Sequence, residues 1–413
     1  MHKIEIKKDS TYLNKNILLL LTFDFISTFG SRIFSFCCAF YILINTSNSY
    51  IYSIYLGLIV LTSIISTPIS GIFIDTVNNK FLIFFSQAVS ILSLFLFFFI
   101  FTDGIAKYII IIIGIILTIT DGINSVIIQS NIQNIVDEQL ERALSIRQTV
   151  ITATSFLAPI LGGILISFIS IKLIASINII TEILAIFLVQ LLPLKKLNKD
   201  KTSSKSNIFI TFKEGTKYLS QKKDILLFMI TSILLNFLLN SLVIGVPVIA
   251  IQKLNFSSSK FGIIESSMII AIFIISLIFS IYPIKKNIYF TFKISVLIQF
   301  IILISLGIFL NFSFSTDISF IFLILLYFTL GVSIPLNNIP YSIYLQKNVE
   351  DSFKGRIFAL NQSIVQSVTP LSMVFYGIII NKNASYVFLF NGVLVLIILI
   401  IFSLVSKSYR KNN

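Results

Sequence analysis

The chain of 413 residues is 56% hydrophobic and 12% charged, and its mean hydropathy is +0.98. This composition excludes a soluble globular protein, because the exterior of such a protein must face water. The surplus of 31 Lys and Arg over 17 Asp and Glu would point to nucleic acid in a soluble chain. In a membrane protein it is typical of cytoplasmic loops. We therefore expect a lipid bilayer, and no nucleic acid, as the partner.

Apolar runs of roughly the 20 residues that a membrane-spanning helix needs recur along the whole chain. The first six are Ile17–Ile44, Ile54–Phe73, Phe81–Phe101, Tyr108–Gln129, Ala143–Phe168 and Leu173–Leu192. After a polar stretch come Ile225–Ile249, Phe261–Tyr282, Ile288–Leu310, Ile318–Pro340, Ile357–Ile380 and Tyr386–Leu404. Because lipid offers no hydrogen-bond partner to bare backbone, each run is predicted to be an α-helix.

The predicted fold class is an all-α integral membrane protein, with about twelve transmembrane helices in two pseudo-symmetric six-helix bundles. Residues 1–193 form the N-terminal bundle, residues 194–224 a cytoplasmic linker, and residues 225–413 the C-terminal bundle. Within the linker, Ile208, Phe212, Gly215 and Leu219 recur at helical spacing. This spacing predicts a short amphipathic helix on the inner membrane surface, for which a solvated connector is the simpler role.

Basic residues separate between the two sides of the predicted membrane. Alternate loops, on the side of both termini and the linker, contain Lys80, Arg142, Arg147, Lys285, Lys286, Lys293, Lys347, Lys354 and Arg356. The loops of the other side contain only Lys107, Lys172, Lys253, Lys260 and Lys382. The positive-inside rule therefore predicts a multi-pass protein of the cell membrane with both termini cytoplasmic.

The second half of the chain repeats a pattern of the first half. Three pairs share an offset of 214 residues: Arg142 and Arg356, Gln148 and Gln362, and Gly163 and Gly377. The acidic pairs Asp137-Glu138 and Glu350-Asp351 are one residue out of this frame, which indicates a single-residue insertion or deletion. Two related membrane halves are the organisation of a secondary transporter.

Ionisable residues inside the apolar runs are costly in lipid and are functional candidates for that reason. Asp24 and Asp121 lie at similar depths, on the order of 10–12 Å from the cytoplasmic end of their runs by the helical rise. Two such carboxylates could share a proton or a cation, as coupling to an ion gradient requires. We assign both to the coupling site, with Glu182 as a third candidate that is equally compatible with a structural role.

Arg32 lies about two turns beyond Asp24, in the outer half of the first run. A guanidinium there needs a counter-ion, for which Glu182 and Glu265 are the candidates. Arg32 therefore either forms a structural ion pair or binds the substrate. Glu265 lies near the outer end of its run, and we expect it only to reach water.

Asparagines form a further group of candidates for the wall of a substrate cavity: Asn236 and Asn240 on the seventh run, and Asn337 and Asn338 on the tenth. Asn side chains in membrane helices also bond from helix to helix. For any single one of these four residues, such interhelical bonding is the simpler interpretation.

Nothing in the sequence supports an enzyme, a cofactor or a metal site. The single histidine is His2, and the two cysteines, Cys37 and Cys38, are adjacent, so no metal-ligand spacing occurs. No phosphate-binding loop ending in Gly-Lys-Ser/Thr is present, so work would come from an ion gradient. We expect a monomer that acts on a small-molecule substrate and uses a proton or cation gradient.

Two motifs carry a resemblance to a known family. Gly71-Ile-Phe-Ile-Asp75, followed by Lys80, lies between the second and third runs, and Ala158-Pro159-Ile-Leu-Gly162-Gly163 lies in the fifth. The first resembles the cytoplasmic gating-loop motif of the major facilitator superfamily, and the second resembles its antiporter element Gly-Pro-x-x-Gly-Gly. Two further stretches are similar to elements of the drug- and macrolide-efflux branch of this superfamily, which also contains siderophore exporters: Phe212-Lys-Glu-Gly215-Thr-Lys-Tyr218 before the seventh run, and Gly355-Arg356-Ile-Phe-Ala-Leu360 at the start of the eleventh.

The chain also departs from the pattern of that family. Thr76, Asn78 and Asn79 stand where the gating-loop motif normally has more basic residues and a second Gly, and Ala158 replaces the first Gly of the antiporter element. The fourth run lacks the Arg of many proton antiporters of the family, so a mechanism through that Arg is not implied.

The resemblance implies two bundles that alternate between inward-open and outward-open states around a cavity lined by helices one, four, seven and ten. It also implies proton-driven export of a hydrophobic drug or natural product. A second hypothesis is export of an anionic siderophore or peptide that Arg32 binds. A third is a membrane sensor or lipid scramblase that transports no solute.

Overall fold

The computed structural model of the chain describes residues 15–46, 48–136, 140–194, 217–219, 221–281 and 288–411. The N-terminal half contains α1 (Lys15–Thr46), α2 (Ser49–Thr76), α3 (Asn79–Ile100), α4 (Ala106–Val136), α5 (Leu140–Phe168) and α6 (Ile171–Leu191). The C-terminal half contains α8 (Lys223–Val248), the π-helical turn η2 (Ile249–Lys253), α9 (Ser258–Ile281), α10 (Ile288–Phe309), α11 (Thr316–Asn348), α12 (Asp351–Ser367) and α13 (Thr369–Lys411). No strand occurs in these ranges.

The described part of the chain has 11 helical segments that are long and apolar enough to cross a membrane. The last of them, Ser363–Lys407, has 45 residues and contains a non-helical residue, Asn383, with φ −161° and ψ 90°. At 1.5 Å per residue this segment is about 68 Å long, roughly twice the thickness of the hydrocarbon layer. It therefore crosses twice, with the kink between the crossings, and the prediction of an all-α membrane fold with about twelve spans is confirmed.

Several helices are longer than the apolar runs that predicted them. α11 continues eight residues beyond Pro340 to Asn348, and α4 continues beyond Gln129 to Val136. Hydropathy detects only the part of a helix that lies in lipid, whereas backbone hydrogen bonds carry the helix on into water.

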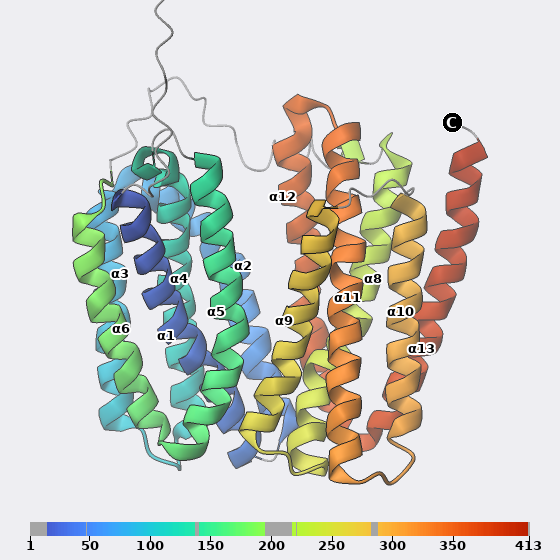
Figure 1. The fold of residues 1–413 in the computed structure, drawn as a ribbon, viewed down its shortest axis with the longest axis horizontal. Coiled ribbons are helices and arrows are strands. Elements are labelled where there is room, and N and C mark those ends of the chain that lie inside the picture. Colours follow the sequence, from blue (N-terminus) through green and yellow to red (C-terminus); the bar gives the residue numbers. More distant parts are fainter. Residues whose placement is uncertain are drawn as a thin grey trace, which may run out of the picture.

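The helices form two bundles that stand side by side (Figure 1). α1–α6 pack on one another and α8–α13 do the same, while the main contacts between bundles are α5 with α9 and α2 with α13. In Figure 1 the bundles are apart at the face on which α13 ends and together at the other. We call these the linker face, where α6 ends and α8 begins, and the opposite face.

The repeated glycines Gly163 and Gly377 lie at the two contacts between bundles. A methyl group on Gly163 of α5 would lie 2.5 Å from the carbonyl oxygen of Ser258 at the start of α9. A methyl group on Gly377 of α13 would collide with Ser53, near the start of α2. A serine hydroxyl donates to each glycine carbonyl: Ser259 Oγ to Gly163 at 3.2 Å, and Ser49 Oγ to Gly377 at 2.8 Å. The two contacts are thus equivalent under the internal repeat, which is the property of a pseudo-twofold axis.

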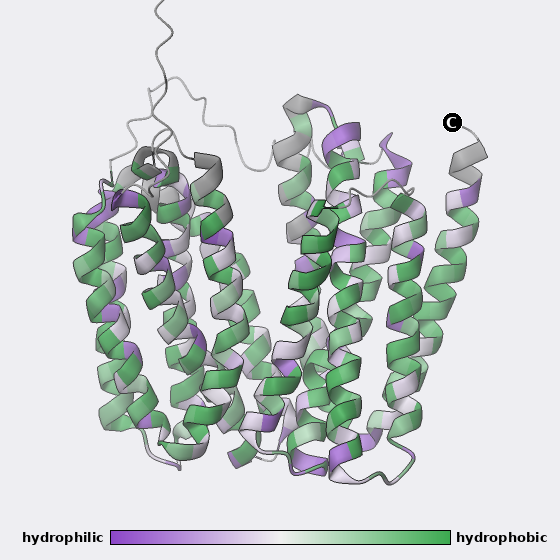
Figure 2. Cartoon of the chain, viewed as in Figure 1, coloured by the Kyte–Doolittle hydropathy of each residue, from purple (hydrophilic) through white to green (hydrophobic). Residues whose placement is uncertain are grey.

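The outer surface of both bundles is hydrophobic (Figure 2). Large apolar side chains are exposed along it, for example Phe99 at 74% and Phe168 at 82%. A soluble protein rarely exposes so much contiguous apolar area. In a membrane these side chains would contact the apolar acyl chains of the lipid.

The boundaries of the bundles and the linker remain predictions. Residues 195–216 of the linker lie outside the described residues, and so does most of the predicted amphipathic helix. The described residues Tyr218 and Leu219 are buried, and the Tyr218 ring stacks on Phe353 of α12 at 4.7 Å between centroids.

Candidate functional site

Two cavities adjoin each other in the interior. The central cavity, of about 410 Å³, lies between the bundles and is walled by α1, α2 and α5 on one side and by α8, α9, α11 and α13 on the other. The polar cavity, of about 450 Å³, lies within the N-terminal bundle among α1, α2, α4 and α5. Arg32 and Ser35 line both, so α1 forms the partition between them.

Asp24 on α1 forms an ion pair with Arg147 on α5 in the wall of the polar cavity. Arg147 Nε donates to Asp24 Oδ2 at 2.5 Å and Nη2 donates to Oδ1 at 3.4 Å, while Nη1 donates to Gln129 of α4 at 2.8 Å. Asp24 is 4% exposed and Arg147 is 8% exposed. A buried pair with this geometry neutralises both charges, and loss of either partner leaves the other uncompensated.

Sequence analysis placed Arg147 among the loop charges, and this assignment was wrong. Arg147 lies more than one turn inside α5, which begins at Leu140. The signal was present in the sequence, because Arg147 falls within the apolar run Ala143–Phe168. Asp24, buried in lipid, also needed a cation.

Asp121 on α4 and Glu182 on α6 lie on either side of one hydroxyl group. Ser31 Oγ lies 3.5 Å from Asp121 Oδ1 and 3.2 Å from Glu182 Oε1. Glu182 is fully buried, and its second carboxylate oxygen has no hydrogen-bond partner among the described residues. A hydroxyl donates only one hydrogen, so Ser31 serves one carboxylate at a time. The hydroxyl can therefore link the two groups when one of them is protonated, because it donates to the ionised carboxylate and accepts from the protonated one.

The structure thus places all three predicted coupling carboxylates, Asp24, Asp121 and Glu182, in the same bundle. Asp24 and Asp121 line one cavity, and Glu182 lies behind Ser31, outside the cavity wall. Asp24 has a cation as its partner, whereas Asp121 and Glu182 share a hydroxyl. The last two are therefore the pair better suited to exchange a proton.

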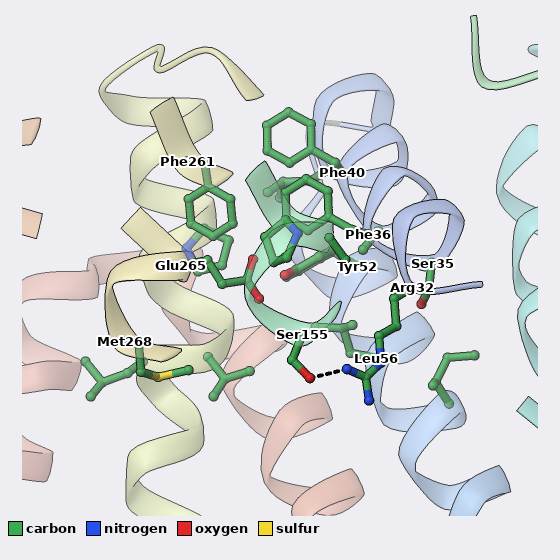
Figure 3. Close-up of a pocket in the computed structure, with 18 of the residues that line it drawn as sticks. Arg32, Ser35, Phe36, Phe40, Tyr52, Leu56, Ser155, Phe261, Glu265 and Met268 are labelled. Carbon is green, nitrogen blue, oxygen red and sulfur yellow. Dashed lines mark hydrogen bonds between the residues drawn. The ribbon is translucent and has the colours of Figure 1, made fainter. Parts of the chain in front are cut away.

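Arg32 is bound to α5 and not to the carboxylates that the sequence suggested. Its Nη1 donates to Ile151 O at 2.8 Å, to Thr154 Oγ1 at 3.1 Å and to Ser155 Oγ, the last shown as a dashed line in Figure 3. Within the described ranges, neither Glu182 nor Glu265 lies within 4.0 Å of its nitrogens. The carboxylate of Asp121 lines the polar cavity together with Arg32. The α5 oxygens hold the guanidinium at the partition between the two cavities.

Of the ionisable candidates, Glu265 has the location that differs most from the one predicted. It projects from α9 into the central cavity on the side of Tyr52 (Figure 3), one turn beyond Phe261, and does not simply reach outer water. Sequence reasoning missed it because depth along a helix says nothing of the direction in which a side chain points. The spacing of Phe261, Glu265 and Met268, which puts all three on one helix face, was a signal that it faces other side chains.

The asparagine candidates do not line the central cavity. Asn240 Nδ2 donates to Ser372 Oγ of α13 at 2.8 Å, and Thr369 Oγ1 of α13 donates to Asn236 Oδ1 at 2.8 Å. These bonds tie α8 to α13, as expected where lipid offers no competing partner. Asn337 and Asn338 lie on α11, outside the wall of the central cavity.

The expectation that helices one, four, seven and ten line the central cavity needs correction. α1, α8 and α11 do line it, but α4 contributes only to the polar cavity. In place of α4, the central cavity is also lined by α2, α5, α9 and α13. These four helices converge at the opposite face and close the cavity there, and we call this closed end the blind end.

The antiporter-type element of α5 packs against two helices. Ala158 is buried and lines the central cavity with Pro159, and the carbonyl of Pro159 touches Gly262 of α9. Gly162 contacts α1, where Cys37 Sγ lies 3.4 Å from its carbonyl oxygen. Together with Gly163, these residues let α5 approach both α1 and α9 closely.

Several other candidates lie where the structure describes little. Lys80 Nζ donates to Gln190 O of α6 at 3.3 Å, Gly71 has open space around it, and Gln148 is exposed. The side chains of Asp75, Arg142, Arg356 and Gln362 lie outside the described part of the chain, so their roles remain predictions.

Two helical bundles related by an internal repeat, around cavities that contain buried charges, define an integral membrane transporter. A family model described as Major Facilitator Superfamily matches residues 20–373, and the chain belongs to this superfamily. No curated protein matches the chain.

Solved structures share this fold over nearly the whole chain. A bacterial homologue of the iron transporter ferroportin in its inward-facing state has a TM-score of 0.74 at 17% identity, over 95% of this chain and 99% of that one. The nucleoside transporter NupG has a TM-score of 0.68 at 14% identity (95% and 100%), and the peptide transporter POT with sulfate has 0.67 at 14% (95% and 94%). Their substrates differ widely and the identities are low, so this likeness concerns the fold alone.

Proposed function

We propose that this chain is a secondary active transporter of the drug- and macrolide-efflux branch, which exports a hydrophobic drug or natural product in exchange for protons. In this proposal the protein lies in the cell membrane as a monomer, with the linker face in the cytoplasm. The state described above is then the inward-facing one, since the bundles meet at the opposite face.

The observation that carries the proposal is the separation of the interior into two cavities of different character. The central cavity has mostly apolar walls, with Arg32 and Glu265 as its charged groups, which suits a hydrophobic organic molecule. The polar cavity contains Asp24, Asp121 and Arg147, which suit a proton.

The partition between the cavities supplies a physical route for coupling. Arg32 is bound to α5 on one side and lines the polar cavity together with Asp121 on the other. Protonation of Asp121 removes a charge that attracts Arg32, and this changes the force between α1, α4 and α5. α5 also forms one of the main contacts with the other bundle, through α9. A change in the force on α5 can therefore favour either the inward-open or the outward-open arrangement of the two bundles.

The test begins with a screen of a pump-deficient bacterial host that expresses the chain, for raised resistance to hydrophobic drugs. A radiolabelled compound from that screen is then offered to energised inverted membrane vesicles. We expect accumulation that collapses with the proton gradient, and at least about tenfold less of it in the variant Asp121→Asn.

The matched control is Asp317→Asn, which removes the same charge from an exposed position at the start of α11. This control should accumulate the compound as the native chain does. Gradient-driven accumulation that Asp121→Asn leaves unchanged would remove Asp121 from the coupling mechanism. Accumulation that ignores the gradient would overturn proton antiport.

One observation favours a second candidate, export of an anionic siderophore or peptide. Arg32 lines the central cavity, and its hydrogen bonds to described residues all come from Nη1, which leaves Nε and Nη2 for a ligand carboxylate. In that case Arg32→Lys would abolish binding of the anion while proton movement continued. We rank this candidate second because apolar side chains form most of the cavity wall.

A further inference from the structure

The blind end of the central cavity contains a carboxylate without a partner. Glu265 lies on one face of α9 together with Phe261 and Met268, and all three line the cavity (Figure 3). No hydrogen bond or ion pair joins Glu265 to another described residue. The buried side chains of Tyr52 and Tyr327 line the same cavity. An unpaired carboxylate in an apolar wall is costly unless a ligand neutralises it.

Aromatic rings surround this carboxylate. Phe261 stacks with Phe36 at 6.4 Å and packs at a tilt of 31° against Phe40 at 6.0 Å between ring centroids, and so joins α9 to α1. The rings of Tyr52 and Tyr327 come from α2 and α11. The faces of aromatic rings attract cations, and the attraction is strongest where water is excluded.

Among the described residues, the basic residue of the cavity forms no ion pair with Glu265. Arg32 is the single Lys or Arg in the described wall, and its Nη1 is bound to α5 near Ser155, at the partition with the polar cavity. Asp121 lines that second cavity. The blind end therefore has one negative charge, several π faces and no cation of its own.

We propose that Glu265 and the rings of Phe36, Phe40, Tyr52, Phe261 and Tyr327 form a recognition site for a hydrophobic organic cation. The ligand class is a quaternary onium or a protonated amine carried on an apolar body. The volume of about 410 Å³ is within the range of pockets for drug-sized molecules. The proposal rests on the proposed transport function for its purpose, although binding can be measured without transport.

The position of the site also fits a role late in export. Glu265 lies about two turns from Ser258, where α9 begins at the opposite face, and the contact of Gly262 with Pro159 lies between them. A cation that entered from the linker face would reach Glu265 at the far end of its path. It would lie next to the contact between α5 and α9 that must open for release.

Equilibrium binding to purified protein in lipid nanodiscs tests the site, with empty nanodiscs as the blank. The probes are tetraphenylphosphonium, a permanent hydrophobic cation, and tetraphenylborate, an anion of the same shape. We expect the native protein to bind the cation, and Glu265→Gln to raise its Kd by at least about tenfold, since a desolvated ion pair is lost. Glu265→Asp should restore part of the affinity, and the control Asp317→Asn should bind as the native protein does.

Three results would overturn the proposal: no binding of tetraphenylphosphonium, equal affinity in Glu265→Gln, or binding of tetraphenylborate alone. The third, with loss of binding in Arg32→Gln, would support the anion exporter. If the cation binds as expected but no proton-driven flux is found in vesicles, the recognition site stands and the proposed antiport function falls.

A second measurement needs no variant and therefore does not depend on the folding of one. Dicyclohexylcarbodiimide reacts with the protonated carboxyl groups of apolar sites, and mass spectrometry of peptides locates the adduct. Saturating tetraphenylphosphonium should slow the modification of Glu265 at least about tenfold, as expected for a carboxylate covered by its ligand. Modification of Glu265 at an unchanged rate would contradict the proposal.

Discussion

At the scale of single residues, the N-terminal bundle owes its internal polarity to a few buried contacts. The pair Asp24–Arg147 and the bridge from Ser31 to Asp121 and Glu182 join four helices: α1, α4, α5 and α6. Among the described residues, the hydrogen bonds between α8 and α13 involve only neutral groups, such as the side chains of Asn240 and Ser372. The buried Asp24–Arg147 ion pair lies in the N-terminal bundle, and this is the basis for our proposal that ion coupling belongs to that bundle.

We predict that removing one partner of the Asp24–Arg147 ion pair destabilises the folded protein more than removing both partners. Arg147→Ala should lower the free energy of unfolding by about 3–5 kcal/mol, because Asp24 is left as an uncompensated buried charge. The double variant Asp24→Asn/Arg147→Gln should recover much of that loss. Chemical denaturation in detergent measures all three proteins, and a double variant no more stable than Arg147→Ala would show that the pair is not the cause.

The Ser31 hydroxyl is predicted to serve proton exchange more than packing. Ser31→Ala removes the donor between Asp121 and Glu182 and should slow proton-coupled transport about tenfold, from the loss of a hydrogen bond to a charged group. Ser31→Thr retains the hydroxyl and should retain the rate. Pyranine fluorescence inside proteoliposomes reports the proton flux. Equal loss in both variants would indicate a steric effect and would contradict the exchange role.

At the scale of secondary-structure elements, contacts between bundles depend on backbone approach. α5 meets α9, and α13 meets α2, through glycines at the same position of the internal repeat. A serine hydroxyl at the start of each partner helix donates to the glycine carbonyl. These hydrogen bonds and small residues can separate without exposing a large apolar core, which suits a gate that opens repeatedly.

Substitution at these glycines is predicted to shift the balance between the two states. Gly163→Ala should favour opening at the opposite face, because the new methyl group would lie 2.5 Å from backbone at Ser258. Gly377→Ala should have a comparable effect, because the new methyl group would collide with the Cβ of Ser53, whose position is fixed by the backbone of α2.

Distances between spin labels on the two bundles, measured at the linker face, report the shift. They should shorten in both Gly163→Ala and Gly377→Ala. The control Gly104→Ala has nothing within 4 Å of the added methyl group and should leave them unchanged. Identical distances in all three variants and the native chain would show that these contacts do not set the state.

At the scale of the whole molecule, orientation is the property on which export depends. The linker face is the side on which the sequence places most Lys and Arg, and the positive-inside rule predicts that this face is cytoplasmic. The native thiols of Cys37 and Cys38 are 0% and 1% exposed, so single cysteines can be introduced against a silent background.

We predict that a membrane-impermeant maleimide labels Lys382→Cys on intact cells and labels Lys407→Cys only after the membrane is permeabilised. Lys382 precedes the kink of α13 at the opposite face, and Lys407 lies near its end at the linker face. The reverse pattern would invert the orientation and turn the proposed exporter into an importer.

The sequence by itself determined the fold class, the helix count and the internal repeat. Each of these depends on hydropathy and on local spacing, because a segment in lipid must satisfy its own backbone and can do so only as a helix. The repeated pair Gly163 and Gly377 also marked, in advance, the two places where the bundles touch.

Only the tertiary structure decided which charged groups meet. Arg147 forms an ion pair with Asp24, and Arg32 donates hydrogen bonds to oxygens of α5. Glu265 lies among aromatic side chains in the wall of the central cavity. None of these partnerships follows from position along a helix, because the rotation of each helix about its own axis is set by packing against its neighbours. Hydropathy predicts how deep in the membrane a residue lies, whereas the role of a charged side chain depends on which side chains it contacts.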